Sequence, residues 1–160
     1  MIRTLFLLAV FMPLFAEKIE FLETRYIEAL NEKTVRAGEI EFEANKASIR
    51  YFPPHERKIT LENNTVTTQT KDLIVQKSVK EEQNTAYMFI IFKAVFENDE
   101  TELGKFFKIT KEDADVVLTP LSTSAPVSKI IYSRDKDKIK KIEIFLWDDS
   151  RIIIDVVKKR

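Results

Sequence analysis

Residues 86–96 set the first condition on the fold, because they contain no glycine or proline and are apolar almost all round. This composition predicts a helix, and Thr85 stands where a capping side chain would begin it. A helix that is apolar on most sides has to be covered on most sides. The rest of the chain is therefore expected to wrap around this helix.

Most of the remaining sequence has the period of two that is typical of β-strands. Residues 38–44 alternate between apolar and acidic side chains, which indicates a strand with one face in water. Polar turns are expected at 135–138 and 148–150. The other predicted strands are 48–52, 58–62, 65–67, 73–79, 107–109, 116–119, 128–133, 139–147 and 152–157, with a second short helix at about 100–106.

The sequence also indicates a hairpin turn and contains one N-terminal segment of ambiguous pattern. Asn63 and Asn64 separate two strand-like runs, and asparagine tolerates the positive φ of a tight hairpin turn. Residues 19–30 fit two interpretations. Apolar side chains at helical spacing favour a helix, whereas Ile19 and Phe21 followed by Tyr26 and Glu28 fit a strand with a slip in register.

The first sixteen residues resemble a secretory signal peptide. A short basic start containing Arg3 precedes an apolar run, and Ala16 is a small residue suited to the position before cleavage. The run is shorter than the ~20 residues that span a bilayer. We therefore expect a leader at 1–16, a single domain at 17–160 and a periplasmic location. The absence of cysteine excludes disulfides and a lipid anchor on this chain.

The search for catalytic and metal-binding motifs gives little. The chain has 2 glycines and 1 histidine, which excludes glycine-rich phosphate loops and His-pair metal sites. His55 lies in a polar turn. The 26 basic and 26 acidic residues are interspersed, so there is no basic face for nucleic acid. The sequence thus predicts a non-enzymatic protein without catalytic residues, metal or cofactor. A hydrolase is disfavoured because no nucleophile and base can be paired.

The predicted helix carries a surplus of bulky apolar side chains, among them Met88, Phe89, Phe92 and Phe96. They can simply form the core. They can also line an openable cavity for an acyl chain, a use that suits methionine because it repacks around flexible ligands. The pattern alone leaves both interpretations open.

The order of these elements resembles LolA and its relatives. The opening segment Leu22-x-x-x-Tyr26-x-Glu28 is similar to the family's F-x-x-x-F-x-Q, and Arg50-Tyr51 before Pro53-Pro54 is similar to R-W-x-Y-x-x-P. The other matching stretches are residues 38–42, the helix from 85 to 90, the "VLTP" strand at 117–120 and the paired strands from 141 to 157. Members usually begin with a helix, for which the expected cleavage leaves almost no room, and this favours the strand interpretation of 19–28.

The resemblance implies a mainly β fold with α, an unclosed antiparallel β-barrel (a half-barrel) wrapped on a central apolar helical lid. It also implies a cavity for acyl chains between sheet and lid. Its expected lining is Phe42, Tyr51, Leu61, Met88, Phe89, Phe92, Phe96, Leu118, Ile144 and Trp147.

The function implied by the resemblance is that of a periplasmic chaperone, a monomer that carries lipoproteins from the inner to the outer membrane. The implied partners are acylated lipoproteins, an inner-membrane ABC-type release complex and an outer-membrane acceptor. The alternative is a non-catalytic structural or regulatory envelope module with the same fold, a dry core and no lipid cargo.

Overall fold

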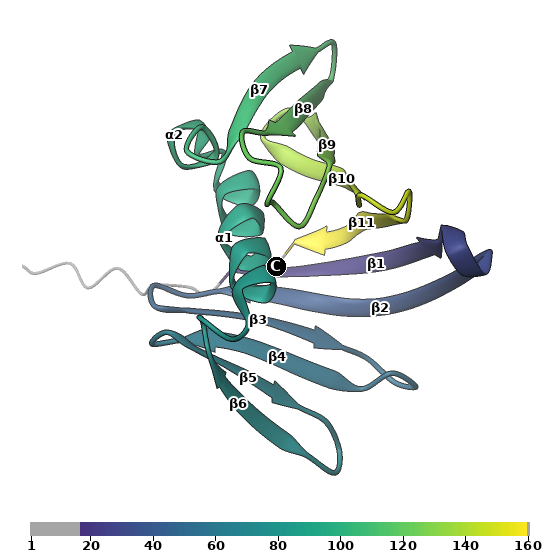
Figure 1. Cartoon of the computed structure of the whole chain (residues 1–160), viewed down its shortest axis with the longest axis vertical. Coiled ribbons are helices and arrows are strands. Elements are labelled where there is room, and N and C mark those ends of the chain that lie inside the picture. Colours follow the sequence, from purple (N-terminus) through teal and green to yellow (C-terminus); the bar gives the residue numbers. More distant parts are fainter. Residues whose placement is uncertain (1–16, 160) are drawn as a thin grey trace, which may run out of the picture.

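The computed structural model describes residues 17–159, so the expected leader lies outside the described residues. Eleven strands and two helices follow one another along this part of the chain (Figure 1). The strands are β1 Glu17–Ile27, β2 Glu32–Phe42, β3 Lys46–Tyr51, β4 Arg57–Glu62, β5 Thr65–Gln69, β6 Ile74–Ser78, β7 Phe107–Glu112, β8 Asp115–Pro120, β9 Lys129–Asp135, β10 Lys138–Phe145 and β11 Arg151–Lys159. The helices are α1 Gln83–Glu97 and α2 Glu100–Leu103, and a 3₁₀ turn, Glu28–Leu30, follows β1.

All the strands belong to one antiparallel sheet, in the order β6-β5-β4-β3-β2-β1-β11-β10-β9-β8-β7. Strands β1 to β6 form one meander and β7 to β11 a second, and the two meet where β1 pairs with β11. The sheet does not close, because β6 and β7 lie at opposite ends of this order. The expectation of an unclosed antiparallel half-barrel on a central helix is confirmed.

Side chains of β2 alternate between the inner and the outer face of the sheet, and from Gly38 onward the apolar ones lie on the inner face. Gly38, Ile40 and Phe42 are buried, whereas the carboxylates of Glu39 and Glu41 lie on the outer face. The strand interpretation of the N-terminal segment is correct, since β1 runs unbroken to Ile27. The turn prediction is also confirmed, because Asn63 and Asn64 have φ angles of 50° and 59°.

Helix α1 crosses the inner face of the sheet and is covered by both meanders (Figure 1). Phe89, Ile91, Phe92 and Val95 are each at most 7% exposed. They share one core with Ile19, Phe21, Ile40 and Phe42 of the first meander and with Leu118, Ile130, Tyr132, Ile142 and Ile144 of the second. The pattern of an all-round apolar helix therefore correctly indicated a helix packed against the whole sheet.

Two details of the helices differ from the prediction. Helix α1 begins at Gln83, so Thr85 is not its capping residue; Thr85 Oγ1 instead donates to the carboxylate of Glu82 at 3.3 Å. Helix α2 ends at Leu103 rather than at 106, and its cap is Asp99, whose side chain accepts from the backbone N–H of Glu102 at 3.0 Å. Within residues 17–159, neither helix is long and apolar enough to cross a membrane.

Candidate functional site

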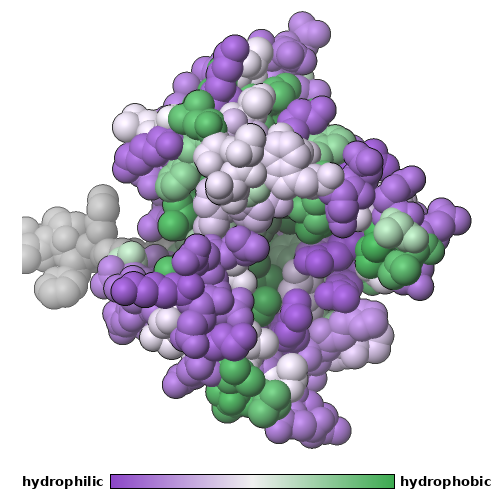
Figure 2. Space-filling view, viewed as in Figure 1, coloured by the Kyte–Doolittle hydropathy of each residue, from purple (hydrophilic) through white to green (hydrophobic). Residues whose placement is uncertain are grey.

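A cavity of about 450 Å³ lies between the N-terminal half of α1 and the inner face of the sheet. In Figure 2 the surface is hollowed near the centre of the view, and apolar atoms lie at the bottom of the hollow. The strands that line the cavity are β1, β3, β4, β5, β10 and β11, so both meanders contribute. The loop that leads into β9 completes the wall with Pro126 and Val127.

The greater part of the lining is apolar. Met88, Phe89 and Phe92 face it from successive turns of α1. Isoleucines of the sheet and the leucine that follows β10 complete the apolar lining: Ile49, Ile59, Ile144, Leu146, Ile152 and Ile154. This arrangement provides a surface on which an apolar chain can exclude water on two sides.

One end of the cavity contains a buried carboxylate. Glu23 is 3% exposed, and its two oxygens have different partners. The hydroxyl of Tyr51 donates to Oε2 at 2.7 Å, and Arg25 Nε donates to Oε1 at 2.8 Å. The charge of Glu23 is therefore hydrogen bonded and paired, as a buried carboxylate requires.

Tyr51 is held at this position by the packing around Gly38. Gly38 is the cross-strand partner of Phe21 in β1 and of Tyr51 in β3. The rings of Phe21 and Tyr51 meet edge to face, 6.0 Å apart, where a larger residue at 38 would have its side chain. Burial, followed by the adjacent charge of Glu23, raises the pKa of Tyr51 well above its usual value. The hydroxyl thus stays a hydrogen-bond donor.

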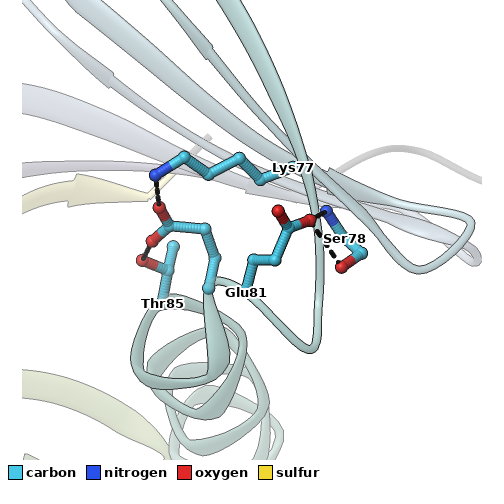
Figure 3. A network of polar contacts seen from close by, with 5 residues as sticks. Lys77, Ser78, Glu81 and Thr85 are labelled. Atoms are coloured by element: carbon cyan, nitrogen blue, oxygen red, sulfur yellow. Dashed lines mark hydrogen bonds and ion pairs between the residues drawn. The ribbon is translucent and has the colours of Figure 1, made fainter.

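The rim of the cavity includes the first turn of α1, which is fastened to β6. Lys77 Nζ lies 2.8 Å from Glu82 Oε1, and the backbone and side chain of Ser78 both donate to Glu81 (Figure 3). Glu82 and Thr85 line the cavity from this turn. A short polar network therefore joins the edge of the sheet to the start of the helix.

The expected cavity residues are only partly brought together. Tyr51, Met88, Phe89, Phe92 and Ile144 line the cavity. The remaining expected residues, Phe42, Leu61, Phe96, Leu118 and Trp147, lie outside its lining.

Leu118 is fully buried in the core, and Phe42 packs against Phe96 with ring centroids 5.9 Å apart. Phe96 also lines a small void of about 20 Å³ deep in the core. Leu61 lines a separate surface pocket together with Phe89. Their side chains contribute to the packing around the cavity rather than to its wall.

The expectation for Trp147 needs correction. Its side chain is 57% exposed, and its indole N–H donates to the carbonyl of Ala125 at 2.8 Å. Strand β10 ends at Phe145, two residues before the predicted end, so Trp147 belongs to a turn and points out of the sheet. It does not line the cavity.

Sequence reasoning missed the polar end of the cavity. The sequence pattern does not single out Glu23, because residues 19–30 fit both a helix and a strand, whereas in the structure Ile19, Phe21 and Glu23 occupy successive inward positions of β1. Once β1 is taken as a strand, this alternation places the carboxylate inside. Among residues 17–159, no group of three or more His, Asp or Glu side chains is arranged to hold a metal ion.

Comparison with known proteins gives no match to a family model and none among curated proteins. Solved structures with a similar arrangement include a LolA superfamily protein from Nitrosomonas europaea, with 8% identity and a TM-score of 0.44 over 92% of this chain and 86% of that one. A putative outer membrane lipoprotein-sorting protein domain from Vibrio parahaemolyticus has 8% identity and a TM-score of 0.45, covering 91% and 84%. The lipoprotein LppX from Mycobacterium tuberculosis has 9% identity and a TM-score of 0.43, covering 89% and 85%. At these values the likeness concerns the arrangement of strands and helix, and the case for a function rests on the cavity of this chain.

Proposed function

We propose that this chain is a carrier that shields an acyl chain in the cavity between α1 and the sheet. The observation that carries the proposal is the cavity itself, about 450 Å³ with a mainly apolar lining contributed by helix and sheet together. Ligand pockets have volumes of roughly 300–1,000 Å³ and are lined in the same way, by apolar side chains with a small number of polar groups.

The cavity opens to the surface between α1 and the sheet, so an apolar chain can reach its wall (Figure 2). Each methylene transferred from water to an apolar site contributes about 0.8 kcal/mol, so an acyl chain that fills only part of the cavity gains a substantial free energy. The start of α1 beside this opening is held to β6 by an exposed ion pair between Lys77 and Glu82, which can break to widen the cavity.

In its finer form, the proposal is a non-catalytic periplasmic chaperone for acylated lipoproteins. It would receive them from an inner-membrane ABC-type release complex and deliver them to an outer-membrane acceptor. The support for this form is the leader-like composition of residues 1–16 and the order of sequence motifs shared with LolA. The alternative is a closed module: a non-catalytic structural or regulatory protein with the same fold, a dry core and no lipid cargo.

The test is native mass spectrometry of the purified chain with a triacylated lipopeptide, alongside displacement of a fluorescent acyl probe. The unaltered chain should form a one-to-one complex with lipopeptide and release the probe. Met88→Glu and Phe92→Glu place a charge in the cavity wall and should weaken binding at least about tenfold. Met88 is the safer variant, because it is only partly buried whereas Phe92 is 7% exposed.

The matched control is Ile90→Glu, the same change on the same helix at a position that is 38% exposed and outside this cavity. It should bind like the unaltered chain. A chain that takes up neither lipopeptide nor probe would support the closed module. Undiminished binding in folded Met88→Glu would show that the cavity is not the site.

A further inference from the structure

The polar end of the cavity carries more positive than negative charge. Arg25 donates to Glu23, and Arg36 is the cross-strand partner of Glu23 in β2. Arg57 is the cross-strand partner of Tyr51 in β4. The guanidinium carbons of Arg36 and Arg57 lie 5.8 Å and 5.5 Å from the centre of the Tyr51 ring. Three guanidinium groups thus contact the Glu23–Tyr51 pair, one at the carboxylate and two at the ring, in a chain whose formal net charge is zero.

This excess of positive charge is not neutralised by carboxylates of the described residues. Arg57 contacts the face of Tyr51 and forms no ion pair with any carboxylate in that part of the chain. The Nε atom of Arg36 is buried and has no hydrogen-bond partner there. The other acid of the cavity rim, Glu82, is already paired with Lys77. Arg36 and Arg57 are half-buried, and a guanidinium group without a carboxylate partner beside an apolar cavity indicates an anionic ligand.

Arg57 is well placed to meet such a ligand. Stacking on an aromatic ring orients a guanidinium while leaving its N–H groups free to bind oxygen atoms in a fork. Arg25 and Arg57 both line the same cavity as Met88 and Phe92. The cavity therefore offers a long apolar wall and, next to it, a cationic end.

We infer that the ligand is an anionic amphiphile, whose acyl chain lies along α1 and whose carboxylate or phosphate oxygens pair with Arg57 and Arg25. The inference rests on the proposed acyl-chain carrier function, not on its lipoprotein form, and adds the chemical class of the cargo. The buried Glu23 fixes Arg25 and Tyr51 in place, so the anion would meet a preorganised site.

The experiment compares palmitate, methyl palmitate and a palmitoyl lysophosphatidate in calorimetric titrations of the purified chain at neutral pH. Palmitate and its ester share the acyl chain and differ in charge. Palmitate should bind at least about tenfold more tightly than the ester, because charge-assisted hydrogen bonds are stronger than neutral ones. The third ligand distinguishes a carboxylate from a phosphate as the preferred anion.

The deciding variant is Arg57→Gln, with Arg57→Lys to restore the charge and Arg50→Gln as control. Arg50 lies on the outer face of β3, where it pairs with Glu39 at 3.7 Å. Arg57→Gln should remove most of the preference for palmitate over the ester. Arg57→Lys should recover part of the preference, and Arg50→Gln should behave like the unaltered chain.

The outcomes separate the two proposals. Equal affinity for palmitate and its ester, unaffected by Arg57→Gln, overturns the anionic cargo but keeps the carrier. Failure of every acyl ligand to bind overturns the carrier and the inference that rests on it. Tighter binding of the anionic ligands that depends on Arg57 supports both.

Discussion

Gly38 is the residue on which the packing of the polar site depends. A Cβ atom at this position would lie 2.5 Å from the carbonyl oxygen of Arg50 and 2.9 Å from Cζ of Phe21. The first contact is with backbone and cannot be relieved by a side-chain rotation. The space left by the missing side chain is what allows the Phe21 and Tyr51 rings to meet beside Glu23.

Gly38→Ala should therefore lower the free energy of unfolding by about 1–3 kcal/mol, the usual cost of overpacking. Ala37→Val is the control, since Ala37 is exposed on the same strand and a β-branched residue suits that position. Urea unfolding of both variants checks the prediction. Equal unfolding free energies of the two variants would mean that the sheet accommodates a Cβ atom at position 38 without loss of stability.

Tyr87 and Tyr51 should respond in opposite ways to the loss of their hydroxyl groups. The hydroxyl of Tyr87 is buried without a partner among the described residues, whereas that of Tyr51 donates to Glu23. At neutral pH, Tyr87→Phe should leave the unfolding free energy unchanged or raise it by up to about 1 kcal/mol. Tyr51→Phe should lower it by about 1–3 kcal/mol, because a buried carboxylate loses a donor.

The pH dependence of Tyr87 follows from the same burial, which raises its pKa to about 12. The unfolded chain has a tyrosine pKa of about 10. The stability that Tyr87 contributes as a neutral phenol is fully present below pH ~10 and is lost as the pH rises toward the folded-state value. Chemical unfolding between pH 9 and pH 12 should show a shallower decline for Tyr87→Phe than for the unaltered chain. Parallel curves would contradict this.

At the scale of single elements, most strands and α1 could be predicted because their inward positions are apolar. The part that could not be predicted is the polar end of the cavity. The inward positions of the first half of β2 are Thr34 and Arg36, and those of the second half of β1 are Glu23 and Arg25. Without apolar residues at these positions the period of two disappears. The sequence therefore predicts β2 only from Gly38 onward and allows two interpretations of β1, for the same reason that the site is polar there.

The first turn of α1 should open more readily once its tether to β6 is removed. Lys77→Ala breaks the contact with Glu82, which is exposed, so the melting temperature should hardly change. Hydrogen exchange of the Ala86 amide should become faster, because this amide donates to the carbonyl of Glu82, the residue that Lys77 holds to the sheet (Figure 3). Lys111→Ala, which breaks the pair of Lys111 with Glu100 near α2, is the control and should leave this amide unchanged.

At the scale of the whole molecule, the open sheet has two edges, β6 and β7, that offer unpaired backbone groups. Exposed edges promote association unless charged side chains discourage it. Lys108 and Lys111 of β7 are exposed and serve that purpose. We accordingly expect the chain to be a monomer.

Replacement of both lysines by valine should produce dimers or larger species, which size-exclusion chromatography with light scattering would detect. The control is the same double change at Lys138 and Lys140, which are also exposed but belong to β10 in the interior of the sheet. Association of the control alone, or of neither variant, would rule out β7 as the protected edge.

The pairing of β1 with β11 has a consequence for how the molecule forms. Glu23 lies opposite Ile154, so the middle of the sheet joins segments from nearly opposite ends of the described chain. The first meander can assemble as soon as β6 has emerged during synthesis, but its β1 edge stays open until the last strand arrives. Contacts between such distant segments slow folding and expose an edge meanwhile. The nascent half-sheet is therefore the species most in need of protection by a folding helper.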